Sequence, residues 1–433
     1  MSGKEEKKDI KVLIIPGGTE IALEIWRSLK DCKNIKLYSA AADVSNHAPY
    51  VFARHFVVPN VNDTEFVDGL NRVLIEQDID FVFPAHDDVI VALSQNADKI
   101  KSQIVSSPTE TCLATRSKSQ TYRLLAGIVP VPLLYDHIET IDQYPVFVKP
   151  DKGQGSQDTH IVNSVDQLSD LLREDRQYIV MEYLPGEEYT VDCFSDREAG
   201  LLFCGGRQRI RIRNGIAMNS KPVYNSIFME YARAIAEKFT LHGAWFFQVK
   251  KDRRNTLKLL EIAPRIAGTM AVHRVRGVNF ALLSIYEQQR MPLEVLLNDL
   301  NVEVDRSFTN RYRPCDIQFG VVYVDLDDTL ILNGIVNTNL VRFLYQCINR
   351  GIRVVLLTKH TLDIGRTLRK HRIAELFDEV IQLRQSLCKA DFIPEKNAIL
   401  IDDSFVERKT VRDRLGILTF DCSMIEMLID ERV

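Results

Sequence analysis

Residues 244–269, AWFFQVKKDRRNTLKLLEIAPRIAGT, are the stretch from which the fold and chemistry of this chain can be argued. An aromatic and apolar run at 245–250 and an apolar run at 256–262 lie on either side of the polar segment 251–255. Two strand-like runs separated by a short polar turn predict a β-hairpin. A hairpin fixes which side chains face each other, so it also predicts which residues share a site.

Glu261 and Gln248 are the polar side chains of this hairpin that can act together. Because residues two apart share one face of a strand, Glu261 can lie across from Gln248, and both can offer oxygens to one hard cation. Arg265 follows the second strand after a proline. The combination indicates a site for nucleotide phosphate. A paired or solvated glutamate is the alternative, and it is favoured if no other segment agrees.

Length and composition describe an ordinary globular protein of several domains. The 433 residues allow about three domains of ~150 residues each. With 45% hydrophobic residues, 26% charged residues and a formal net charge of -4, the chain shows no basic surface of the kind that binds nucleic acid. No run approaches the roughly 20 apolar residues that cross a bilayer. The polar residues 1–10 contain no signal-peptide segment.

The eight cysteines are scattered, with no pair at the close spacing of a zinc site. Reduced thiols in a cytoplasmic protein are the simplest account of this distribution. The expected location is therefore the cytoplasm, with no membrane or nucleic-acid partner.

The N-terminal part of the chain alternates strand-like and helical patterns. Strands are predicted at residues 11–15, 35–39 and 81–84, and helical spacing of apolar residues covers 19–30 and 64–77. Such alternation predicts a parallel sheet with helices on both faces. The glycine turn after the first strand lacks the third glycine of a GxGxxG motif, so NAD binding is not expected.

Two lysines lie next to segments that can hold phosphate. Lys118 is near the start of a helix predicted at residues 115–125, where a positive charge opposes the helix dipole. Lys149 ends a strand predicted at 145–150 and precedes a loop of small and polar residues, 151–157. Glycine loops can wrap backbone amides around phosphate oxygens. Taken singly, a solvated surface lysine and a flexible hairpin tip are the alternatives.

A strand predicted at residues 177–183 is broken by proline and glycine before the chain becomes strand-like again. The break can leave the backbone near Glu182 and Leu184 free to bond a purine edge. Glu188 can accept hydrogen bonds from ribose hydroxyls. Solvent-facing glutamates are the alternative.

Arginines alternate along the next strand-like segment, at Arg207, Arg209, Arg211 and Arg213. Because side chains alternate along a strand with a period of two, all four are expected on one face. They predict contact with phosphate or with a carboxylate substrate, and a charged sheet edge is the alternative.

The order of these features resembles the ATP-grasp superfamily over about residues 11–310. The features are a lysine at a helix start, a lysine before a glycine loop, a broken strand with glutamate, an Arg-x-Arg strand and a hairpin ending in Glu-Ile-Ala-Pro-Arg. The resemblance is greatest to the carbamoyl-phosphate synthase large-subunit type and related carboxylate–amine ligases. It implies ATP and magnesium as cofactors, and a Rossmann-like N-terminal subdomain followed by an ATP-grasp domain.

The resemblance also implies roles for individual residues. Gln248 and Glu261 would hold magnesium, and Arg265 would face the transferred phosphoryl group. Nucleotide binding is implied for Lys118, Lys149, Gly153, Gly155, Ser156, Glu182, Tyr183, Leu184, Glu188, Arg207 and Arg209. A substrate carboxylate would attack the γ-phosphate, and an amine or ammonia would displace phosphate from the resulting acyl phosphate.

One position departs from the superfamily pattern. Many members carry asparagine two residues after the metal-binding glutamate, where this chain has Ala263. Alanine offers no side-chain oxygen, so a second magnesium would depend on Glu261, Gln248 or water. Some relatives share Glu-Ile-Ala-Pro-Arg, which keeps activity open.

A charged segment at residues 304–314 marks the expected start of a C-terminal domain. Polar side chains follow the strand-like runs beyond it, at Asp325, Asp327, Thr358, Lys389, Asp402 and Asp403. Because the carboxyl ends of parallel strands meet at one edge of a sheet, these groups are expected in one crevice.

This set, in this order, resembles the haloacid dehalogenase superfamily. The resemblance implies Asp325 as a nucleophile that forms an aspartyl phosphate, and Asp327 as general acid and base. It implies Thr358 and Lys389 as phosphate contacts, with Lys396 as the alternative to Lys389. Crowded carboxylates repel one another without a cation, so magnesium is expected. The implied ligands are Asp325, Asp327, Asp402 and Asp403.

The predicted molecule is an α/β protein with domains at residues 1–113, 114–310 and 317–433. The last is expected to be Rossmann-like and to lack a large cap, because the gaps between its motifs are short. A noncatalytic receiver-like domain is the alternative. Expected partners are small-molecule carboxylate and amine substrates and a phosphorylated substrate. The oligomeric state stays open, a homo-oligomer included.

The predicted function is that of a bifunctional enzyme, an ATP- and magnesium-dependent ligase joined to a magnesium-dependent phosphohydrolase. A kinase-like phosphotransferase is the alternative for the ATP-grasp half. Ala263 keeps open a further alternative, in which one half is a noncatalytic regulatory nucleotide-binding module. Amine-dependent ATP consumption distinguishes the ligase from both.

Overall fold

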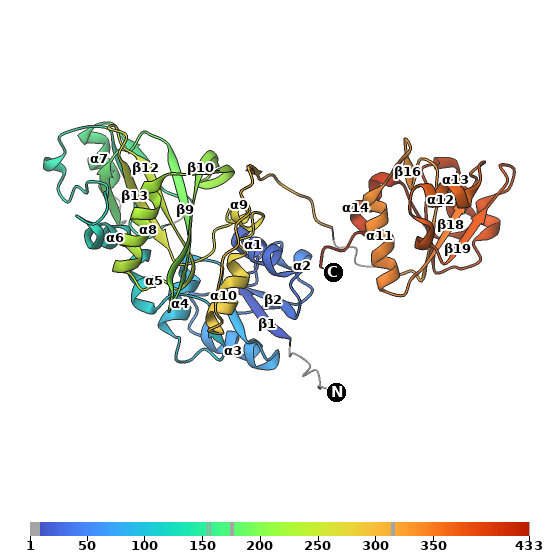
Figure 1. The fold of residues 1–433 in the computed structure, drawn as a ribbon, viewed down its shortest axis with the longest axis horizontal. Coiled ribbons are helices and arrows are strands. Elements are labelled where there is room, and N and C mark those ends of the chain that lie inside the picture. Colours follow the sequence, from blue (N-terminus) through green and yellow to red (C-terminus); the bar gives the residue numbers. More distant parts are fainter. Residues whose placement is uncertain (1–8, 154, 156, 174–176, 313–316, 433) are drawn as a thin grey trace. The chain divides into compact units, whose positions relative to one another are not determined.

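The chain forms two compact units in a computed structural model, Met1–Phe308 and Thr309–Val433 (Figure 1). The structure describes residues 9–153, 155, 157–173, 177–312 and 317–432. Each unit has its own sheets and its own hydrophobic clusters. In these described ranges, no helix is long and apolar enough to cross a bilayer.

A five-stranded parallel sheet of order β3-β2-β1-β4-β5 opens the first unit. Its strands are β1 (Ile10–Ile15), β2 (Ile35–Ala41), β3 (His55–Val57), β4 (Phe81–Pro84) and β5 (Gln103–Ile104). The helices of this region are α1 (Glu20–Leu29), α2 (Ala48–Val51), α3 (Phe66–Glu76), α4 (Asp87–Gln95) and α5 (Thr109–Arg116). The predicted strands and helices are confirmed, with ends that differ by a few residues.

Helices cover both faces of this sheet, as predicted. Val12 and Ile14 of β1 pack with Ile25 of α1 in one buried cluster. Leu13 and Ile15 belong to a different cluster that includes residues of α3 and α4. Neighbouring residues of one strand therefore enter two separate cores, which is why the strand is apolar throughout.

A three-stranded antiparallel sheet of order β7-β6-β8 follows in the chain. Its strands are β6 (Val146–Pro150), β7 (His160–Val162) and β8 (Tyr178–Glu182). Helix α6 (Lys118–Leu125) and the 3-10 turn η1 (Ile138–Thr140) precede β6, and α7 (Val165–Leu172) packs on one face. The helix predicted at 115–125 is instead two helices, because the Ser117 hydroxyl caps α6 by accepting from the Gln120 backbone N–H.

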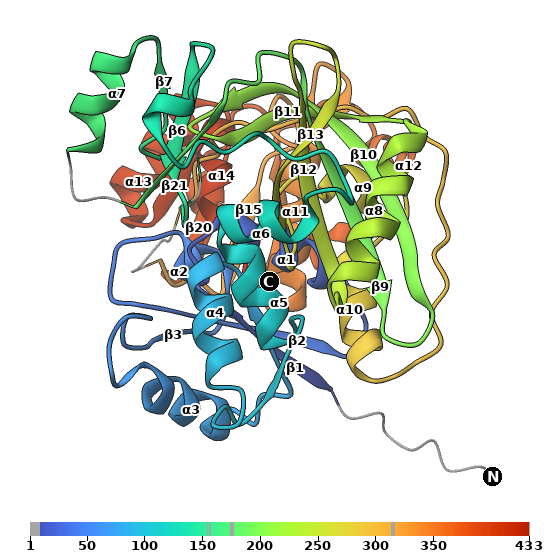
Figure 2. The ribbon, with the colours of Figure 1, turned by 90° about the vertical axis from the view of Figure 1, so that its left-hand side faces the viewer.

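The largest sheet has six strands in the order β13-β12-β9-β10-β11-β14. Its strands are β9 (Glu188–Asp196), β10 (Gly200–Arg213), β11 (Ile216–Val223), β12 (Gly243–Lys251), β13 (Leu257–Ala263) and β14 (Val304–Asp305). The accompanying helices are α8 (Ser226–Lys238), α9 (Ala271–Arg274) and α10 (Phe280–Gln288). Helices α5 and α6 contact β13 (Figure 2). Strands β12 and β13 pair antiparallel, which confirms the predicted hairpin.

The two faces of the six-stranded sheet differ in chemistry. Val191, Trp245 and Phe247 pack with α8 on one face. Because side chains alternate along a strand, Gln248 points to the opposite face. Polar residues of β9, β10, β12 and β13 therefore gather on the face that lies away from α8.

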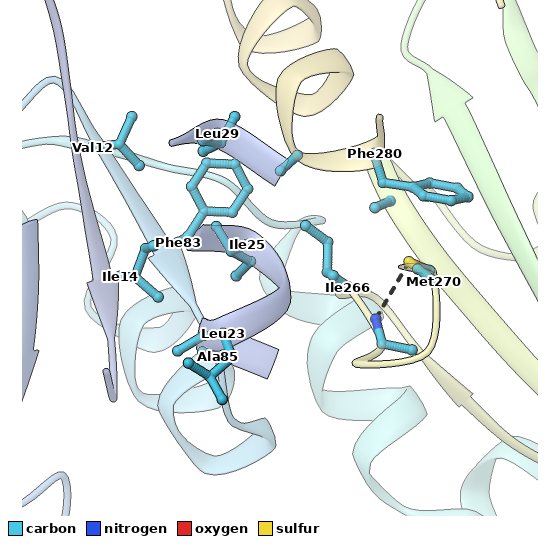
Figure 3. Packing of buried hydrophobic residues seen from close by; sticks show 14 of the residues in the cluster. Val12, Ile14, Leu23, Ile25, Leu29, Phe83, Ala85, Ile266, Met270 and Phe280 are labelled. Carbon is cyan, nitrogen blue, oxygen red and sulfur yellow. Dashed lines mark hydrogen bonds between the residues drawn. The ribbon is translucent and has the colours of Figure 1, made fainter. Parts of the chain in front are cut away.

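The segment after the hairpin packs against the N-terminal sheet (Figure 3). Ile266 and Met270 join Ile25 and Phe83 in one buried cluster. This packing fixes the chain where it leaves β13, and with it the position of Arg265.

The second unit contains a five-stranded parallel sheet of order β19-β18-β15-β20-β21 and a small hairpin, β16-β17. The strands are β15 (Val321–Val324), β16 (Ile331–Leu332), β17 (Ile335–Val336), β18 (Arg353–Thr358), β19 (Glu379–Gln382), β20 (Ala398–Ile401) and β21 (Leu418–Phe420). The helices are α11 (Thr338–Asn349), α12 (Ile364–Lys370), α13 (Phe405–Leu415) and α14 (Ile425–Leu428), with 3-10 turns η2 (Ala374–Leu376), η3 (Lys389–Phe392) and η4 (Cys422–Met424). Val322 and Tyr323 enter different clusters, so both faces of this sheet are buried.

Candidate functional site

A cavity of about 360 Å³ in the first unit is lined by residues of both the three-stranded and the six-stranded sheet. The predicted site residues in its lining are Lys118, Lys149, Gly153, Gly155, Tyr183, Leu184, Glu188, Arg209, Gln248 and Glu261. The fold thus brings together residues that lie far apart in the sequence.

Lys118 is held at the start of α6 by contacts with the end of β6. Asp151 accepts hydrogen bonds from the Ser117 hydroxyl and the Ser119 backbone N–H, both at 2.7 Å. The Lys118 ammonium donates to the carbonyl oxygen of Gly153 at 3.0 Å. The helix start and the glycine loop are therefore tied together around this lysine.

Lys149 ends β6 and is almost entirely buried. Its ammonium donates to Tyr122 Oη at 2.9 Å, and that hydroxyl donates to the Leu260 carbonyl oxygen at 2.6 Å. Burial and the nearby Lys118 lower the pKa of Lys149 to about 7, although Glu261 opposes the change. Burial also lowers the pKa of Lys118. Neither ammonium has an ion-pair partner in the part of the chain that the structure describes, which suits a ligand that brings negative charge.

Gln248 and Glu261 lie directly opposite each other in the β12–β13 pair, as predicted. The register shifts by one residue just beyond this pair, which is a β-bulge. Gln248 Oε1 accepts from the Arg209 guanidinium at 2.6 Å. The Glu261 carboxylate makes no hydrogen bond or ion pair with the described residues. A carboxylate without a partner, opposite an amide oxygen, offers the donors that magnesium prefers.

The loop after β6 borders the cavity with Gly153 and Gly155. Gly155 has a φ of +60°, in the left-handed region that glycine adopts without strain. Ser156, the third residue predicted to bind nucleotide here, lies outside the described residues. The binding of phosphate by this loop stays a prediction.

Tyr183 and Leu184 line the cavity, whereas Glu182 does not. The Glu182 carboxylate accepts from the Leu133 backbone N–H at 2.7 Å and pairs with Lys258. Its side chain is therefore occupied away from the cavity. The prediction concerned the backbone near Glu182 to Leu184, so its contact with a purine edge stays a prediction.

The four arginines of β10 do not share one face, contrary to the prediction. A register shift between Arg209 and Arg211 marks a β-bulge, which changes the alternation of side chains. Arg209 lines the cavity and pairs with Glu188. Arg211 is exposed and pairs with Asp305 instead. Beyond the bulge, Ile212 takes the place in the cavity lining that an arginine was expected to fill.

Arg207 also lies away from the cavity, so its predicted contact with nucleotide is wrong. Its guanidinium donates to both oxygens of Asp192, at 2.7 and 3.1 Å, and the two side chains are 2% and 0% exposed. His273 Nε2 lies 3.1 Å from the Gly205 carbonyl oxygen and 3.7 Å from Asp192. A buried ion pair satisfied within the protein has a structural role.

Arg265 is paired with Asp87, a residue that was not predicted to belong to the site. Its guanidinium donates to both Asp87 oxygens, at 2.5 and 3.1 Å, and lies over the Phe246 ring. Burial alone would raise the pKa of Asp87, but Arg265 lowers it to about 2. Asp87 begins α4 just beyond β4. An acidic residue that follows the carboxyl end of a parallel strand is a sequence signal for a site residue, so Asp87 could have been predicted. Arg265, Lys118 and Glu261 line one small neighbouring cavity.

Asp325, Asp402 and Asp403 come together at one edge of the sheet in the second unit. Each offers a carboxylate oxygen, and these oxygens lie within 4.8 Å of one another. Lys389 donates to Asp325 and to Asp402, at 2.6 Å in each case. The Thr329 hydroxyl lies 3.1 Å from an Asp403 oxygen and accepts from the Asp403 backbone N–H at 2.9 Å. Hard oxygen donors at this spacing fit magnesium.

The charges of this cluster are not balanced. Burial raises the pKa of Asp325 to about 6, with Lys389 opposing the shift and Asp402 reinforcing it. Burial works against the charge of Lys389, but the two aspartates raise its pKa. The Lys389 ammonium pairs with Asp325 and Asp402, and the Asp403 carboxylate adds a third acidic group, so negative charge is left for a divalent cation.

The Asp327 carboxylate is not part of this cluster, which corrects its predicted place among the metal ligands. Both of its oxygens lie close to His360 Nδ1, at 3.0 and 2.9 Å. The Asp327 side chain is 53% exposed, whereas that of His360 is 9% exposed. His360 was not predicted, although it follows Thr358 by two residues at the end of the same strand, where a polar group meets the crevice.

The first unit contains an ATP-grasp fold, as the sequence predicts. Residues 174–305 match the family model described as "ATP-grasp in the biosynthetic pathway with Ter operon". ATP-grasp enzymes bind ATP and magnesium. The haloacid dehalogenase resemblance of the second unit stays a prediction.

Several solved structures are similar to this chain. Biotin carboxylase from Campylobacter jejuni has a TM-score of 0.56 and 15% identity, over 66% of this chain and 73% of that one. L-amino acid ligase from Bacillus licheniformis has a TM-score of 0.52 and 18% identity, over 66% and 76%. N5-carboxyaminoimidazole synthetase from Staphylococcus aureus has a TM-score of 0.54 and 17% identity, over 69% and 82%. Among curated protein sequences, none matches the chain.

Proposed function

We propose that the first unit is an ATP- and magnesium-dependent carboxylate–amine ligase. The observation that carries this proposal is the shared cavity, into which separate elements bring Lys118, Lys149, Gln248 and Glu261. Among the described residues, the two buried ammonium groups have no ion-pair partner and the half-buried Glu261 carboxylate has no partner, an arrangement that is costly unless a ligand completes it. Magnesium and a phosphate chain supply the missing charges.

The chemistry follows from these residue types. Magnesium held by Glu261 and Gln248 would neutralise the phosphate oxygens of ATP. Lys118 and Lys149 would bind and orient the phosphates while the substrate carboxylate attacks the terminal phosphorus. The bond to the ADP oxygen breaks, an acyl phosphate forms, and the amine then displaces phosphate from it. The protein contributes positioning and electrostatic stabilisation rather than covalent chemistry.

Two features bear on the details of this reaction. Two of the similar structures are named as a ligase and a synthetase, which favours bond formation over simple phosphate transfer.

Ala263 lies opposite Phe246 in the hairpin and is buried in a hydrophobic cluster. A second magnesium would therefore rely on Glu261, Gln248 or water.

A metabolite screen tests the proposal. Full-length protein with ATP and magnesium is supplied with mixtures of carboxylates and amines, and the release of ADP and phosphate is measured. Glu261→Gln should lower the rate roughly 100-fold or more, because it removes the charged metal ligand. Glu230→Gln, an exposed glutamate on α8, is the matched control and should keep full activity.

The same assay separates the alternatives. ADP and phosphate release that requires an amine supports the ligase. ATP consumption without an amine, with a phosphorylated product, would identify a kinase-like phosphotransferase. Nucleotide binding without turnover would identify a regulatory module.

We propose further that the second unit is a magnesium-dependent phosphohydrolase that works through an aspartyl phosphate. The observation that carries this proposal is the convergence of Asp325, Asp402, Asp403 and Lys389 at one sheet edge. Asp325 would attack phosphorus, and Lys389 would balance its charge. Asp325→Asn should abolish magnesium-dependent phosphate release, whereas Asp413→Asn, at an exposed position of α13, should not change it.

The substrate of this second site is expected to be large or unhindered. Between β15 and α11 the described chain has only the small hairpin β16-β17, so no large cap is inserted there. A panel of phosphate esters of increasing size tests this expectation. Rapid turnover of small sugar phosphates, with no response to larger esters, would count against it.

A further inference from the structure

His360, in the second unit, is fixed in one orientation by hydrogen bonds. Its backbone N–H donates to Thr358 Oγ1 at 3.1 Å, and its carbonyl oxygen accepts from Gln382 Nε2 at 2.7 Å. The ring atom Nε2 lies 3.0 Å from Thr367 Oγ1. The other ring nitrogen, Nδ1, faces both carboxylate oxygens of Asp327.

Asp327, by contrast, is anchored on one side only. Its side chain is 53% exposed, and His360 is the only partner of its carboxylate within the described ranges of the chain. An exposed aspartate without an anchor samples several side-chain rotamers. The fixed imidazole therefore determines where this carboxylate points, and its free side faces the solvent from which a substrate arrives.

The proposed phosphohydrolase reaction has two chemical steps, and each step needs a proton transfer at Asp327. Asp325 attacks phosphorus, the bond to the leaving oxygen breaks with its electron pair on that oxygen, and the Asp327 carboxyl gives that oxygen a proton. The Asp327 carboxylate then takes a proton from water while the water oxygen bonds to phosphorus. The bond between phosphorus and Asp325 breaks, inorganic phosphate leaves, and both carboxyl groups return to their starting states.

We propose that His360 is a positioning residue that holds Asp327 for these proton transfers. The proposal rests on the proposed phosphohydrolase function, since Asp327 has this task only in that reaction. The geometry supports the proposal, because Nδ1 lies within hydrogen-bond distance of both carboxylate oxygens and Thr367 contacts the opposite edge of the ring. His360 also bonds Thr358 through its backbone, so one residue links the predicted phosphate contact with the acid–base group.

Two amide variants of the full-length protein test the contacts of the two ring edges separately. His360→Asn places an amide near the position of Nδ1 and keeps a donor for Asp327. His360→Gln extends toward Thr367 and withdraws the donor from Asp327. Each variant is mixed rapidly with p-nitrophenyl phosphate or with glycerol phosphate in the presence of magnesium.

The two substrates differ in whether the first step needs a proton. Nitrophenolate leaves without one, whereas the glycerol alkoxide requires one. In His360→Gln we expect a nitrophenol burst at nearly the wild-type rate, followed by turnover slowed roughly 10- to 100-fold. Cleavage of glycerol phosphate should slow already in the first step. His360→Asn should keep most of both activities. Equal loss of burst and turnover in both variants would overturn the proposal and leave His360 a structural residue.

A crystal structure of the His360→Gln protein gives a readout that does not depend on activity. We expect the Asp327 carboxylate to leave its position or to occupy several rotamers. An unchanged single rotamer would overturn the proposal. If the wild-type protein hydrolyses neither these esters nor any member of the panel of larger phosphate esters, the phosphohydrolase function fails, and the structural comparison still decides whether His360 positions Asp327.

Discussion

Arg207 and Asp192 bury opposite charges within the six-stranded sheet, with side chains that are 2% and 0% exposed. A buried ion pair adds little stability over an apolar pair, but removing one partner leaves an uncompensated charge. Asp192→Ala should therefore lower the free energy of unfolding by about 3–5 kcal/mol. Urea denaturation monitored by tryptophan fluorescence measures the change, since Trp245 is fully buried nearby.

The double variant Asp192→Leu/Arg207→Met is the control for this prediction. Because it removes both charges and keeps apolar volume, it should recover most of the lost stability. A loss as large as that of Asp192→Ala would show that packing, rather than the unpaired charge, causes the effect.

His273 should make the stability of the first unit depend on pH. Burial lowers the pKa of His273 to about 4, with Asp192 opposing the shift and Arg207 and Arg276 reinforcing it. The unfolded chain binds this proton near the ordinary pKa of 6.5. The contribution of His273 is therefore complete above that pH and is lost as the pH falls toward the folded-state pKa. At about pH 5 the loss should be roughly 2 kcal/mol.

Denaturation of His273→Phe across the same pH range checks this expectation. The variant lacks the titrating group, so its free energy of unfolding should fall less steeply between neutral and acidic pH than that of the wild-type protein. Parallel curves for the two proteins would assign the acid sensitivity to other groups.

At the residue scale, the sequence predicts local geometry well and distant partners poorly. The opposed pair Gln248 and Glu261 was predictable because a period of two and a short turn decide it. The partners of Arg265 and Asp327 were not, because Asp87 and His360 reach them only through tertiary folding. Arg207 was misplaced because a sequence does not show which of several similar arginines is buried.

At the scale of elements, glycine positions offer a direct test of backbone geometry. Gly416 ends α13 with a φ of +70°, and a Cβ there would meet nothing within 4 Å. Gly416→Ala should therefore cost about 1 kcal/mol through backbone strain alone. Gly365 lies inside α12, where a Cβ meets neighbours no closer than 3.4 Å. Gly365→Ala should instead be neutral or stabilise by up to about 1 kcal/mol.

Chemical denaturation of both variants provides the measurement. The same glycine-to-alanine substitution is expected to lower the free energy of unfolding at Gly416 and to leave it unchanged or raise it at Gly365. If both variants lose similar stability, the left-handed backbone at Gly416 does not explain the loss there.

The ends of helices and strands can be predicted where a local sequence signal, such as a capping residue, marks them. Ser117 is a capping residue and divides α5 from α6, so the single helix predicted there overlooked a signal that the sequence contains. The β10 bulge is different, because it lies in the pairing of this strand with β11, which is separate from the local sequence of β10. A period of two along one strand cannot reveal it.

At the scale of the whole molecule, the two units bury separate hydrophobic clusters. Calorimetry of the full-length protein should therefore show two unfolding transitions. A nonhydrolysable ATP analogue with magnesium, at about 100 times its Kd, should stabilise only the transition of the first unit, by roughly 2.7 kcal/mol. Glu261→Gln should remove most of this shift. An equal shift of both transitions would contradict binding to the first unit alone.

The alternation of strands and helices predicted the parallel sheet of the first unit, and the polar residues that follow strand-like runs predicted the parallel strands of the second unit. The order of the six-stranded sheet was beyond prediction, because β12 pairs with β9 across a long stretch of intervening chain. Such pairing is decided by the packing of whole layers, which no local pattern reports.

Two successive register shifts in β10, one between Arg209 and Arg211 and one between Arg211 and Ile212, affect how this chain is compared with others. The second shift cancels the first, because Arg209 pairs with Ser220 and Ile212 pairs with Ala217, three residues further along each strand. The strand therefore gains no residue overall, yet Arg209 and Ile212 both line the cavity although they lie three positions apart. When binding residues are transferred between homologues, this segment should be aligned without a gap, and its inward positions should be taken from the strand pairing rather than from a period of two.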